Sequence, residues 1–389
     1  MTNASIIILT WQGMPYITAC LDAVYAQTYA RFDVIVVDNA STDGTADFVA
    51  AHYPQAQLIR NTRNAGFAAG SNVGIRVAQG DVIVLLNQDT VVEREWLAAI
   101  MQAMQQPGVG IVGCKCLYPD GRIQHAGGYL ARPSAQPQHY GCGEVDHGQY
   151  DESRDVEFVT GAALAISRAA LYTIGELDAD LSPAYFEDTD WCFRARAAGY
   201  AVRYEPTARL THHDGGSMKR ESQIMAYHRG RVGFALKHWP REQLKQYTLL
   251  GFAQQLTNGS ILYAIAVAHA NLANISRLHR IRTCRNAIYG DNPSMCLSDS
   301  EWDEIAENLL TERDQALHWA YIHKVNIPPN SSQGELNAVE QFISLPYPLR
   351  YRNTLSYVLA EVANNYQHGG MKSVLRYGAR FILNAGRRQ

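Results

Sequence analysis

The N-terminal part of the chain alternates short apolar runs with segments of helical spacing, and this alternation constrains the fold more than any other feature. The apolar runs are rich in Ile, Val and Leu and fall in residues 4–11, 32–42, 56–61 and 81–87. Helical spacing or helix-entry signals fill residues 14–29, 41–53, 65–80 and 91–104. Strands that are apolar on both faces are typical of parallel sheets covered by helices on both sides. The expected fold class is therefore α/β, with a mostly parallel sheet.

Polar side chains stand where each predicted strand ends. Thr10, Asp38 and Asn64 follow the first three strands, and Asn87 and Asp89 follow the fourth. The carboxyl ends of parallel strands meet at one edge of a sheet, so we expect these side chains to share a cleft. Carboxylate and amide oxygens there suit a hard divalent cation. The alternative for Asp89 is a cap on the helix expected at residues 91–104.

Size, charge and cysteine content narrow the class of protein. A chain of 389 residues suits one large domain with an appendage, which we place at residues 1–240 and 241–389. A net charge of −3 argues against nucleic-acid binding through bulk electrostatics. The seven scattered cysteines lack the spacing of a disulfide framework or zinc site, and residues 1–11 lack the features of a signal peptide. We expect a cytoplasmic location.

A second acidic group lies at residues 187–190. Glu187, Asp188 and Asp190 crowd the first turn of a predicted helix that follows an aromatic residue. One interpretation is stabilisation of the helix dipole, with Arg194 and Arg196 as partners. The other is chemical, because carboxylates this close together raise the pKa of one of them, and such a group can act as a base.

Seven separated segments then carry a resemblance to a known family. "IIILTW", "VIVVDNASTDGT", "NAGFAAGSNVGI", "VLLNQDTVV", "VTGAALAISRAAL", "FEDTDWCFRARAAGY" and "LTHHDGGS" occur in the order and spacing of glycosyltransferase family 2. The chain resembles its rhamnosyltransferase-like and galactofuranosyltransferase-like branch from about Ser5 to Pro240. The resemblance implies a Rossmann-like nucleotide-diphospho-sugar transferase (GT-A) domain and an inverting transfer that depends on Mg²⁺ or Mn²⁺.

The resemblance also implies roles for particular residues on the donor side. Asp38 would meet the base, where a carboxylate suits the imide N–H of uracil or thymine and therefore favours a UDP or dTDP donor. Asn87 replaces the first Asp of the family's Asp-x-Asp motif, so Asp89 would be the main metal ligand of this motif. The complete predicted donor-binding set is Thr10, Asp38, Asn64, Gly66, Asn72, Asn87, Asp89 and Gly161.

On the acceptor side, Asp188 matches the family's catalytic base. Glu187 is the alternative base or an orienting group. The resemblance places a metal-binding histidine in the segment containing His212 and His213. Adjacent residues of a strand point to opposite faces, so only one ring enters the cleft, and we favour His212 beside Asp89.

The remaining segments are less specific. Residues 128–155 are rich in Gly, Pro and polar residues and are expected to form a mobile loop that closes over substrate. Residues 241–389 are expected to form a helical extension that packs on the catalytic domain, with contact at a membrane surface as the alternative. The last twenty residues hold five Lys or Arg and no acid, which suits an anionic surface.

The sequence therefore predicts a transferase that moves a sugar, with rhamnose suggested by the branch, from a nucleoside-diphosphate donor. The acceptor would be a hydroxyl of a cell-surface glycan or lipid-linked intermediate. One alternative is a sugar-phosphate nucleotidyltransferase, but residues 9–15 lack the basic, Gly-rich signature of that class. The other is a non-catalytic nucleotide- or carbohydrate-binding scaffold, which the intact Asp38, Asp89 and Asp188 oppose.

Overall fold

The computed structural model describes residues 2–214, 220–247, 261–290 and 292–323. The chain divides into two compact units: residues 1–247 with 284–296, and residues 248–283 with 297–389. The candidate site lies wholly in the first unit. The basic tail singled out from the sequence lies outside the described residues.

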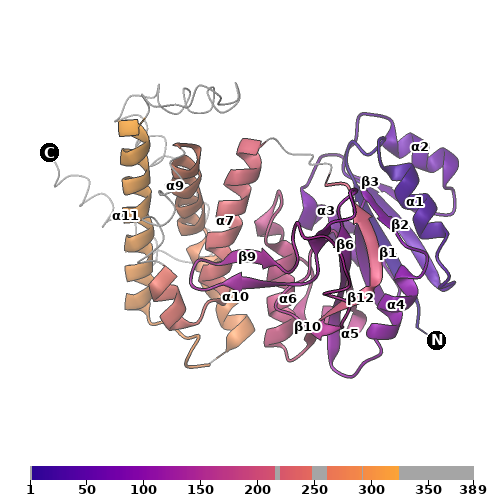
Figure 1. Cartoon of the computed structure of the whole chain (residues 1–389). Helices are drawn as coiled ribbons and strands as arrows, with labels where there is room; N and C mark the ends of the chain where they lie inside the picture. The colour runs from indigo at the N-terminus through magenta and orange to yellow at the C-terminus, as the bar shows by residue number, and fades with distance from the viewer. Residues whose placement is uncertain (1, 215–219, 248–260, 291, 324–389) are drawn as a thin grey trace. The chain divides into compact units, whose positions relative to one another are not determined.

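The first unit begins with the alternation that the sequence predicts (Figure 1). Buried apolar runs form the strands, and the segments of helical spacing form the helices between them. In chain order the elements are β1 (Ala4–Thr10), α1 (Ile17–Tyr25), β2 (Phe32–Asp38), α2 (Thr45–His52), β3 (Gln57–Arg60), α3 (Phe67–Val77), β4 (Val82–Asn87) and, after a short strand, α4 (Trp96–Ala103).

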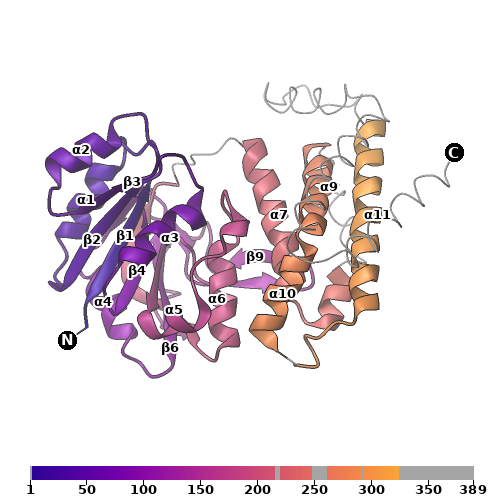
Figure 2. The same cartoon turned by 180° about the vertical axis from the view of Figure 1, so that it is seen from behind.

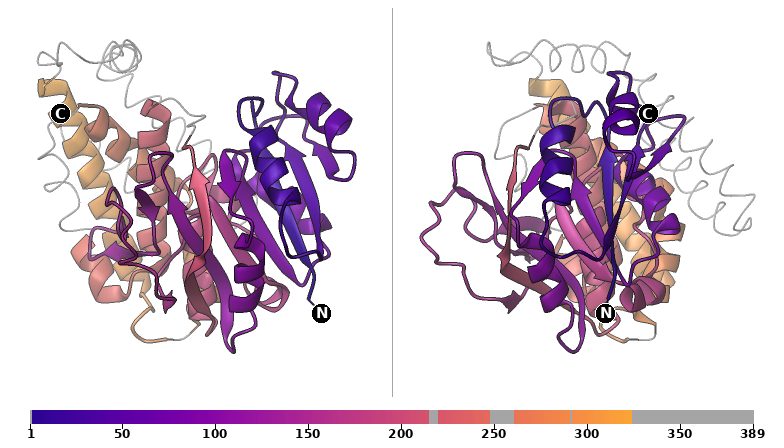
Figure 3. Two further views of the ribbon diagram at one scale, coloured as in Figure 1. Left: turned by 45° about the vertical axis from the view of Figure 1, so that its right-hand side comes forward. Right: turned by 90° about the vertical axis from the view of Figure 1, so that its right-hand side faces the viewer.

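These strands join a larger sheet with the order β10-β12-β6-β11-β4-β1-β2-β3. The added strands are β6 (Val109–Leu117), β10 (Arg154–Asp155), β11 (Ala163–Ser167) and β12 (Ala201–His212), the longest of them, which can be followed in Figure 3. β3, β2, β1 and β4 are mutually parallel, and β12 is parallel to β6, whereas β11 runs antiparallel to both of its neighbours. The expected α/β class with a mostly parallel sheet is confirmed.

Helices cover both faces of the sheet. Alternate residues of β1, β2 and β4 pack with α1, α2 and α4 in one hydrophobic core. On the opposite face lie α3, α5 (Arg168–Ile174) and α6 (Glu187–Ala197), which are visible in Figure 2. With both faces buried, the carboxyl ends of the strands remain as the edge at which polar side chains are exposed.

The strand β5 (Thr90–Val92) stands where the sequence suggested the start of a helix. It pairs antiparallel with β12, with Thr90 opposite His212. The helix α4 begins only at Trp96, and its N-cap residue, Glu95, makes no capping hydrogen bond with its side chain. Asp89 is therefore not a helix cap, and the pairing instead places it beside the end of β12.

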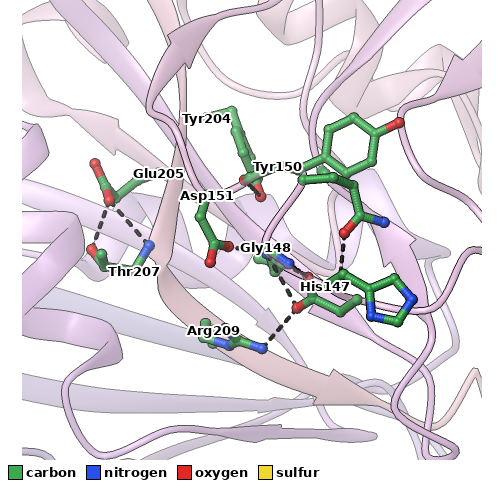
Figure 4. Close-up of polar contacts among 12 residues, drawn as sticks. His147, Gly148, Tyr150, Asp151, Tyr204, Glu205, Thr207 and Arg209 are labelled. Atoms are coloured by element: carbon green, nitrogen blue, oxygen red, sulfur yellow. Dashed lines mark hydrogen bonds and ion pairs between the residues drawn. The ribbon is translucent and has the colours of Figure 1, made fainter.

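Residues 128–155, expected as a mobile loop, hold the hairpin of β8 (Gly128–Ala131) and β9 (Gln136–His139) and end in β10. An ionic cluster ties this segment to the sheet (Figure 4). The fully buried ammonium of Lys115 on β6 lies 3.1 Å from Asp146 and also contacts Asp151, and Arg209 lies 2.9 Å from Asp146. Because an unpaired buried charge is costly, these contacts hold the segment in one place.

The second unit is helical in its described part, which confirms the expected helical C-terminal region. It contains α9 (Ile261–Ser276) and α11 (Asp299–His323), which pack on each other. Of α10 (Leu278–Tyr289), residues 278–283 belong to the second unit and residues 284–289 to the first. The buried amide of Asn271 donates to the Leu309 carbonyl at 3.1 Å, which fixes α9 against α11. Within the described residues, no helix combines the length and apolar character that a membrane span requires.

We predict that Lys115→Met destabilises the first unit by about 2–4 kcal/mol, because two carboxylates lose their buried cation. Asp151 is half-exposed, so the loss should lie below that of a fully buried pair. Urea denaturation followed by circular dichroism measures the shift. Asp120→Asn, which removes one partner of the exposed pair with Arg122, is the matched control and should cost less than about 1 kcal/mol. Equal midpoints for Lys115→Met and wild type would contradict the anchoring role.

Candidate active site

A cleft of about 650 Å³ opens at the carboxyl ends of the strands. The predicted site residues that line it are Asn64, Gly66, Asn87, Asp89, Gly161, Glu187, Asp188 and His212. Strand register explains part of this convergence, because Leu9 lies opposite Asn87 and Thr10 lies opposite Asp38. Residues that are far apart in the sequence of the first unit, from Leu9 to Tyr227, therefore line one cavity.

The side chain of Gln88 explains how β4 ends. Its amide oxygen accepts hydrogen bonds from the Thr10 hydroxyl at 2.5 Å and the Trp11 N–H at 3.1 Å, and its amide nitrogen donates to the Trp11 carbonyl at 3.0 Å. Gln88 thus joins the ends of β4 and β1 with side-chain hydrogen bonds. Its neighbours Asn87 and Asp89 are left to line the cleft.

Three predicted donor-binding residues do not line this cleft. Thr10 is buried beneath Gln88, and Asp38 is 3% exposed and accepts the Ser41 N–H at 3.1 Å. Their donor-binding roles remain predictions. The Asn72 amide instead makes two hydrogen bonds to the backbone of Leu177, at 2.9 and 3.1 Å. Asn72 therefore ties α3 to the segment before α6, and its donor-binding role also stays a prediction.

Asn39 shapes the wall on the predicted donor side. Its side chain donates to the Asn64 side chain at 2.9 Å and accepts the Ala65 N–H at 3.0 Å. Gly66 follows with a φ of 80°, and a Cβ there would lie 2.9 Å from the Pro183 backbone. Only glycine fits this close approach without strain. The turn at Asn64 is thus held in a fixed shape at the cleft.

Of the two adjacent histidines, His212 is the one that lines the cleft. Its Nε2 lies 3.3 Å from an Asp89 carboxylate oxygen, and its Nδ1 lies 2.7 Å from the Gln124 amide oxygen. The Gln124 side chain also contacts the Tyr118 hydroxyl. A Gln oxygen can only accept, so Nδ1 carries a proton, and in a neutral ring the Nε2 lone pair then faces a carboxylate. The His212 Nε2 lone pair and the Asp89 carboxylate are both hydrogen-bond acceptors, and a cation between two such groups stabilises them.

These residues fit a divalent ion that is completed by other ligands. Within the described residues, no three His, Cys, Asp or Glu side chains form a group able to hold a metal. Asp89 and His212 could supply two ligands, which suits ions that bind through one or two protein groups and substrate phosphates. The Gln124 contact with the far ring nitrogen is the usual arrangement behind a metal-bound histidine.

Asp188 and Glu187 lie at the start of α6 but have different surroundings. One Asp188 oxygen accepts the Gly161 N–H at 2.7 Å, and the other accepts the Thr189 N–H at 2.6 Å. Glu187 is buried, and one of its oxygens has no hydrogen-bond partner. Burial raises the pKa of Glu187 well above its ordinary value, and the charge of Asp188 adds to this effect. The raised pKa expected from the crowded acids thus falls on Glu187.

The backbone before α6 is strained. Tyr185 and Phe186 have φ values of 77° and 73°, a region that bulky residues rarely adopt. The Phe186 ring packs on Tyr227 and Phe234, and Gly230 leaves room for the Tyr185 carbonyl, which would lie 2.7 Å from a Cβ there. Packing against α7 (Arg220–His238) therefore stabilises the turn that delivers Glu187 and Asp188.

Asp190, in the first turn of α6, holds this helix in place through a buried ionic network. It is fully buried and lies 2.8 Å from each of Arg194, Lys237 and His238. Burial alone would raise its pKa, but Lys237 and Arg194 hold the pKa well below its ordinary value. His238 also contacts the Tyr289 hydroxyl at 2.8 Å. This network fixes the helix that carries Asp188, two residues away.

Several cleft residues were missed by sequence reasoning. Gln88, Gln124, His125 and His139 lie in turns or short strands without a hydrophobic period. The sequence feature that could have indicated two of them is the polar pair Gln124 and His125. This pair lies in a short strand, β7 (Ile123–His125), which pairs with β6.

Comparisons with known proteins bear on this architecture. The model of the family described as glycosyl transferase family 2 matches residues 5–175. The O-antigen biosynthesis protein RfbC of Myxococcus xanthus is 29% identical over 228 residues, which are 56% of this chain and 18% of that protein. The N-acetylglucosaminyl-diphospho-decaprenol L-rhamnosyltransferase of Mycobacterium tuberculosis is 25% identical over 276 residues, or 63% of this chain and 89% of that enzyme.

Two relatives are much longer than the matched segment, since the chain covers 27% of a protein from Sinorhizobium fredii and 18% of RfbC. Among solved structures, GalNAc-T7 with UDP, GalNAc and Mn²⁺ is 15% identical with a TM-score of 0.53, covering 80% of this chain and 58% of that chain. This likeness concerns the fold alone and agrees with the predicted GT-A architecture.

We predict that His238 makes the first unit acid-sensitive. Burial lowers the pKa of His238 to about 4, although Asp190 acts in the opposite direction. The unfolded chain takes up this proton near pH 6.5, so stability is lost as pH falls from about 6.5 to about 4. Over this pH range, the free energy of unfolding of His238→Gln should fall by about 2–3 kcal/mol less than that of wild type. Urea denaturation at several pH values measures both. Parallel curves for the two proteins would contradict this role.

Proposed function

Residues 5–175 belong to glycosyl transferase family 2, and from this premise we propose that the chain is an inverting, metal-dependent glycosyltransferase. It moves a sugar from a nucleoside-diphosphate donor to a hydroxyl group. The observation that carries the proposal is that Asp89, His212 and Asp188 line one shared cleft. A donor diphosphate and an acceptor alcohol can therefore meet there.

The charge of the cleft supports metal dependence. Besides the buried Glu187, the described residues that line it include the acids Asp89, Asp188 and Asp214, with no Lys or Arg. A diphosphate would be repelled by these carboxylates unless a cation accompanied it. Mg²⁺ or Mn²⁺ held by Asp89 and His212 would supply charge neutralisation for the leaving diphosphate.

The position of Asp188 supports its role as the base. In a single displacement, the acceptor oxygen forms the new bond to the anomeric carbon as the bond to the diphosphate breaks, and the hydroxyl proton passes to a carboxylate. The Gly161 N–H holds one Asp188 oxygen in a defined position. The same turn connects to the other side of the cleft, because the Ala162 carbonyl accepts the Asn87 N–H at 2.9 Å. Glu187, which is buried, orients this region.

The relatives support the proposed substrates. The Mycobacterium tuberculosis relative is named as a rhamnosyltransferase that acts on a diphospho-decaprenol sugar, and the Myxococcus xanthus relative as an O-antigen biosynthesis protein. We therefore propose a rhamnose donor of the dTDP or UDP type. The acceptor is a cell-surface glycan or lipid-linked intermediate. Such an acceptor places the reaction at the inner face of the plasma membrane, with peripheral contact through the C-terminal region.

A donor panel tests this function. Wild-type protein is incubated with UDP-, dTDP- and GDP-sugars and Mn²⁺ or Mg²⁺, with and without lipid-linked acceptor, and nucleoside-diphosphate release is measured. We expect metal-dependent release from a pyrimidine donor. Asp188→Asn should retain donor affinity while transfer falls at least about 10²-fold, because the base is lost. Transfer close to wild type in Asp188→Asn would exclude it as the base, and release from no donor would contradict the function.

Gln124→Leu tests the metal ligand assignment without touching a ligand. The variant removes the acceptor for the His212 Nδ1–H, so the ring loses its fixed orientation. Affinity for Mn²⁺ in the presence of UDP or dTDP should fall about 10- to 100-fold by calorimetry. Gln124→Glu keeps an acceptor and should retain most of the affinity. Unchanged titrations in Gln124→Leu would remove His212 from the metal site.

A further inference from the structure

Two histidines outside the predicted site face each other in the cleft. His125 ends β7 and His139 ends β9, and their Nδ1 atoms are 2.7 Å apart. Both rings pack against Phe158, with centroids 5.8 and 5.3 Å from it. His125 is buried, whereas His139 is exposed, and both line the cleft.

Hydrogen bonds fix the protons on this pair. The Thr160 N–H donates to His125 Nε2 at 3.3 Å, so this nitrogen is an acceptor. In a neutral ring the proton must then lie on Nδ1, from which it is donated to His139 Nδ1. His139 Nδ1 is therefore an acceptor too, and the His139 proton lies on Nε2. A backbone amide thus sets the proton position of an exposed ring through a second, buried ring.

The exposed ring lies within electrostatic reach of the proposed base. Although the His139 residue is partly exposed to solvent, the protein around its ring desolvates it and lowers the pKa of His139, and the charge of Asp188 acts in the opposite direction. Burial lowers the pKa of His125 well below its ordinary value, with His139 adding to the effect. Both rings are therefore neutral at physiological pH, as the relay of hydrogen bonds requires.

We propose that His139 is an acceptor-binding residue, whose Nε2–H donates to an oxygen of the acceptor next to the attacking hydroxyl. This inference rests on the proposed function and specifies its acceptor, which must present two neighbouring oxygens, as a sugar ring does. Asp188 then meets the hydroxyl that attacks, and His139 binds the neighbouring oxygen. A simple alcohol would use only the first of these contacts.

Two other roles fit the geometry less well. A metal between the rings would need room for two bonds of about 2.0–2.1 Å in a bent arrangement, and a separation of 2.7 Å is too short. A purely structural pair would leave no exposed ring in the cleft beside the base. The anchoring of residues 128–155 by Lys115 makes His139 a preformed part of the wall.

Variants of His139 in the full chain test the proposal. Acceptors are para-nitrophenyl glycosides of glucose, galactose, mannose, rhamnose and N-acetylglucosamine, and their deoxy analogues that lack the neighbouring hydroxyl. His139→Phe should lower kcat/KM for the best glycoside about tenfold, the loss expected for one hydrogen bond, but should not lower it for the deoxy analogue. His139→Gln keeps an N–H donor and should recover most activity.

A second measurement needs no acceptor. Nitrogen-15 NMR of the histidine rings at pH 7.5 should show His139 protonated at Nε2, and His125→Phe should remove this preference. Protonation of His139 at Nδ1 would overturn the proposal. So would an equal fall in kcat/KM for the glycoside and its deoxy analogue in His139→Phe. Absence of donor hydrolysis in wild type would contradict the proposed function instead, so the two failures are distinguishable.

Discussion

The antiparallel pairing of β5 with β12 is the contact on which the candidate site depends. It places Thr90 opposite His212, so the residue before β5, Asp89, comes to lie 3.3 Å from the His212 ring. The His213 N–H also donates to the Asp89 carbonyl at 2.9 Å, which extends the pairing by one hydrogen bond. Without these few contacts, the proposed metal ligands Asp89 and His212 would not be held side by side. A short strand pairing therefore creates the end of the cleft at which we propose that the diphosphate binds.

The turn at residues 160–162 joins the other parts of the site. Thr160 donates to His125, Gly161 donates to Asp188, and Ala162 accepts from Asn87. Three consecutive residues thus contact the proposed acceptor-binding pair, the proposed base and the end of β4. The backbone of the turn makes all three contacts, two through N–H groups and one through a carbonyl group. A displacement of this turn would disturb orientation on both sides of the reacting bond at once.

Much of the fold could be predicted from the sequence, because continuous apolar strands and helical spacing specify a covered parallel sheet. Asn87 and Asp89 could be placed in one cleft because strand ends converge, whereas Asp188 and His212 were assigned to it through the family resemblance. The position of Asn72 outside the cleft could not be predicted, since its hydrogen bonds to the Leu177 backbone depend on a distant segment. Gln88, Gln124 and the His125–His139 pair depend on side-chain contacts across the chain, which leave no periodic signal in the sequence. The ion pairs of Lys115 with Asp146 and Asp151 could not be predicted either, because they also join residues that are far apart in the sequence.

The central claim is that an acidic cleft accepts a diphosphate only together with a divalent cation. Calorimetric titration of the wild-type protein with UDP and dTDP, in Mn²⁺ and then in excess EDTA, tests it most directly. We predict that UDP or dTDP binds the protein in Mn²⁺ and that its affinity is at least about tenfold weaker in EDTA. Equal affinity in the two buffers would contradict it, because the carboxylates would then tolerate the diphosphate without a cation.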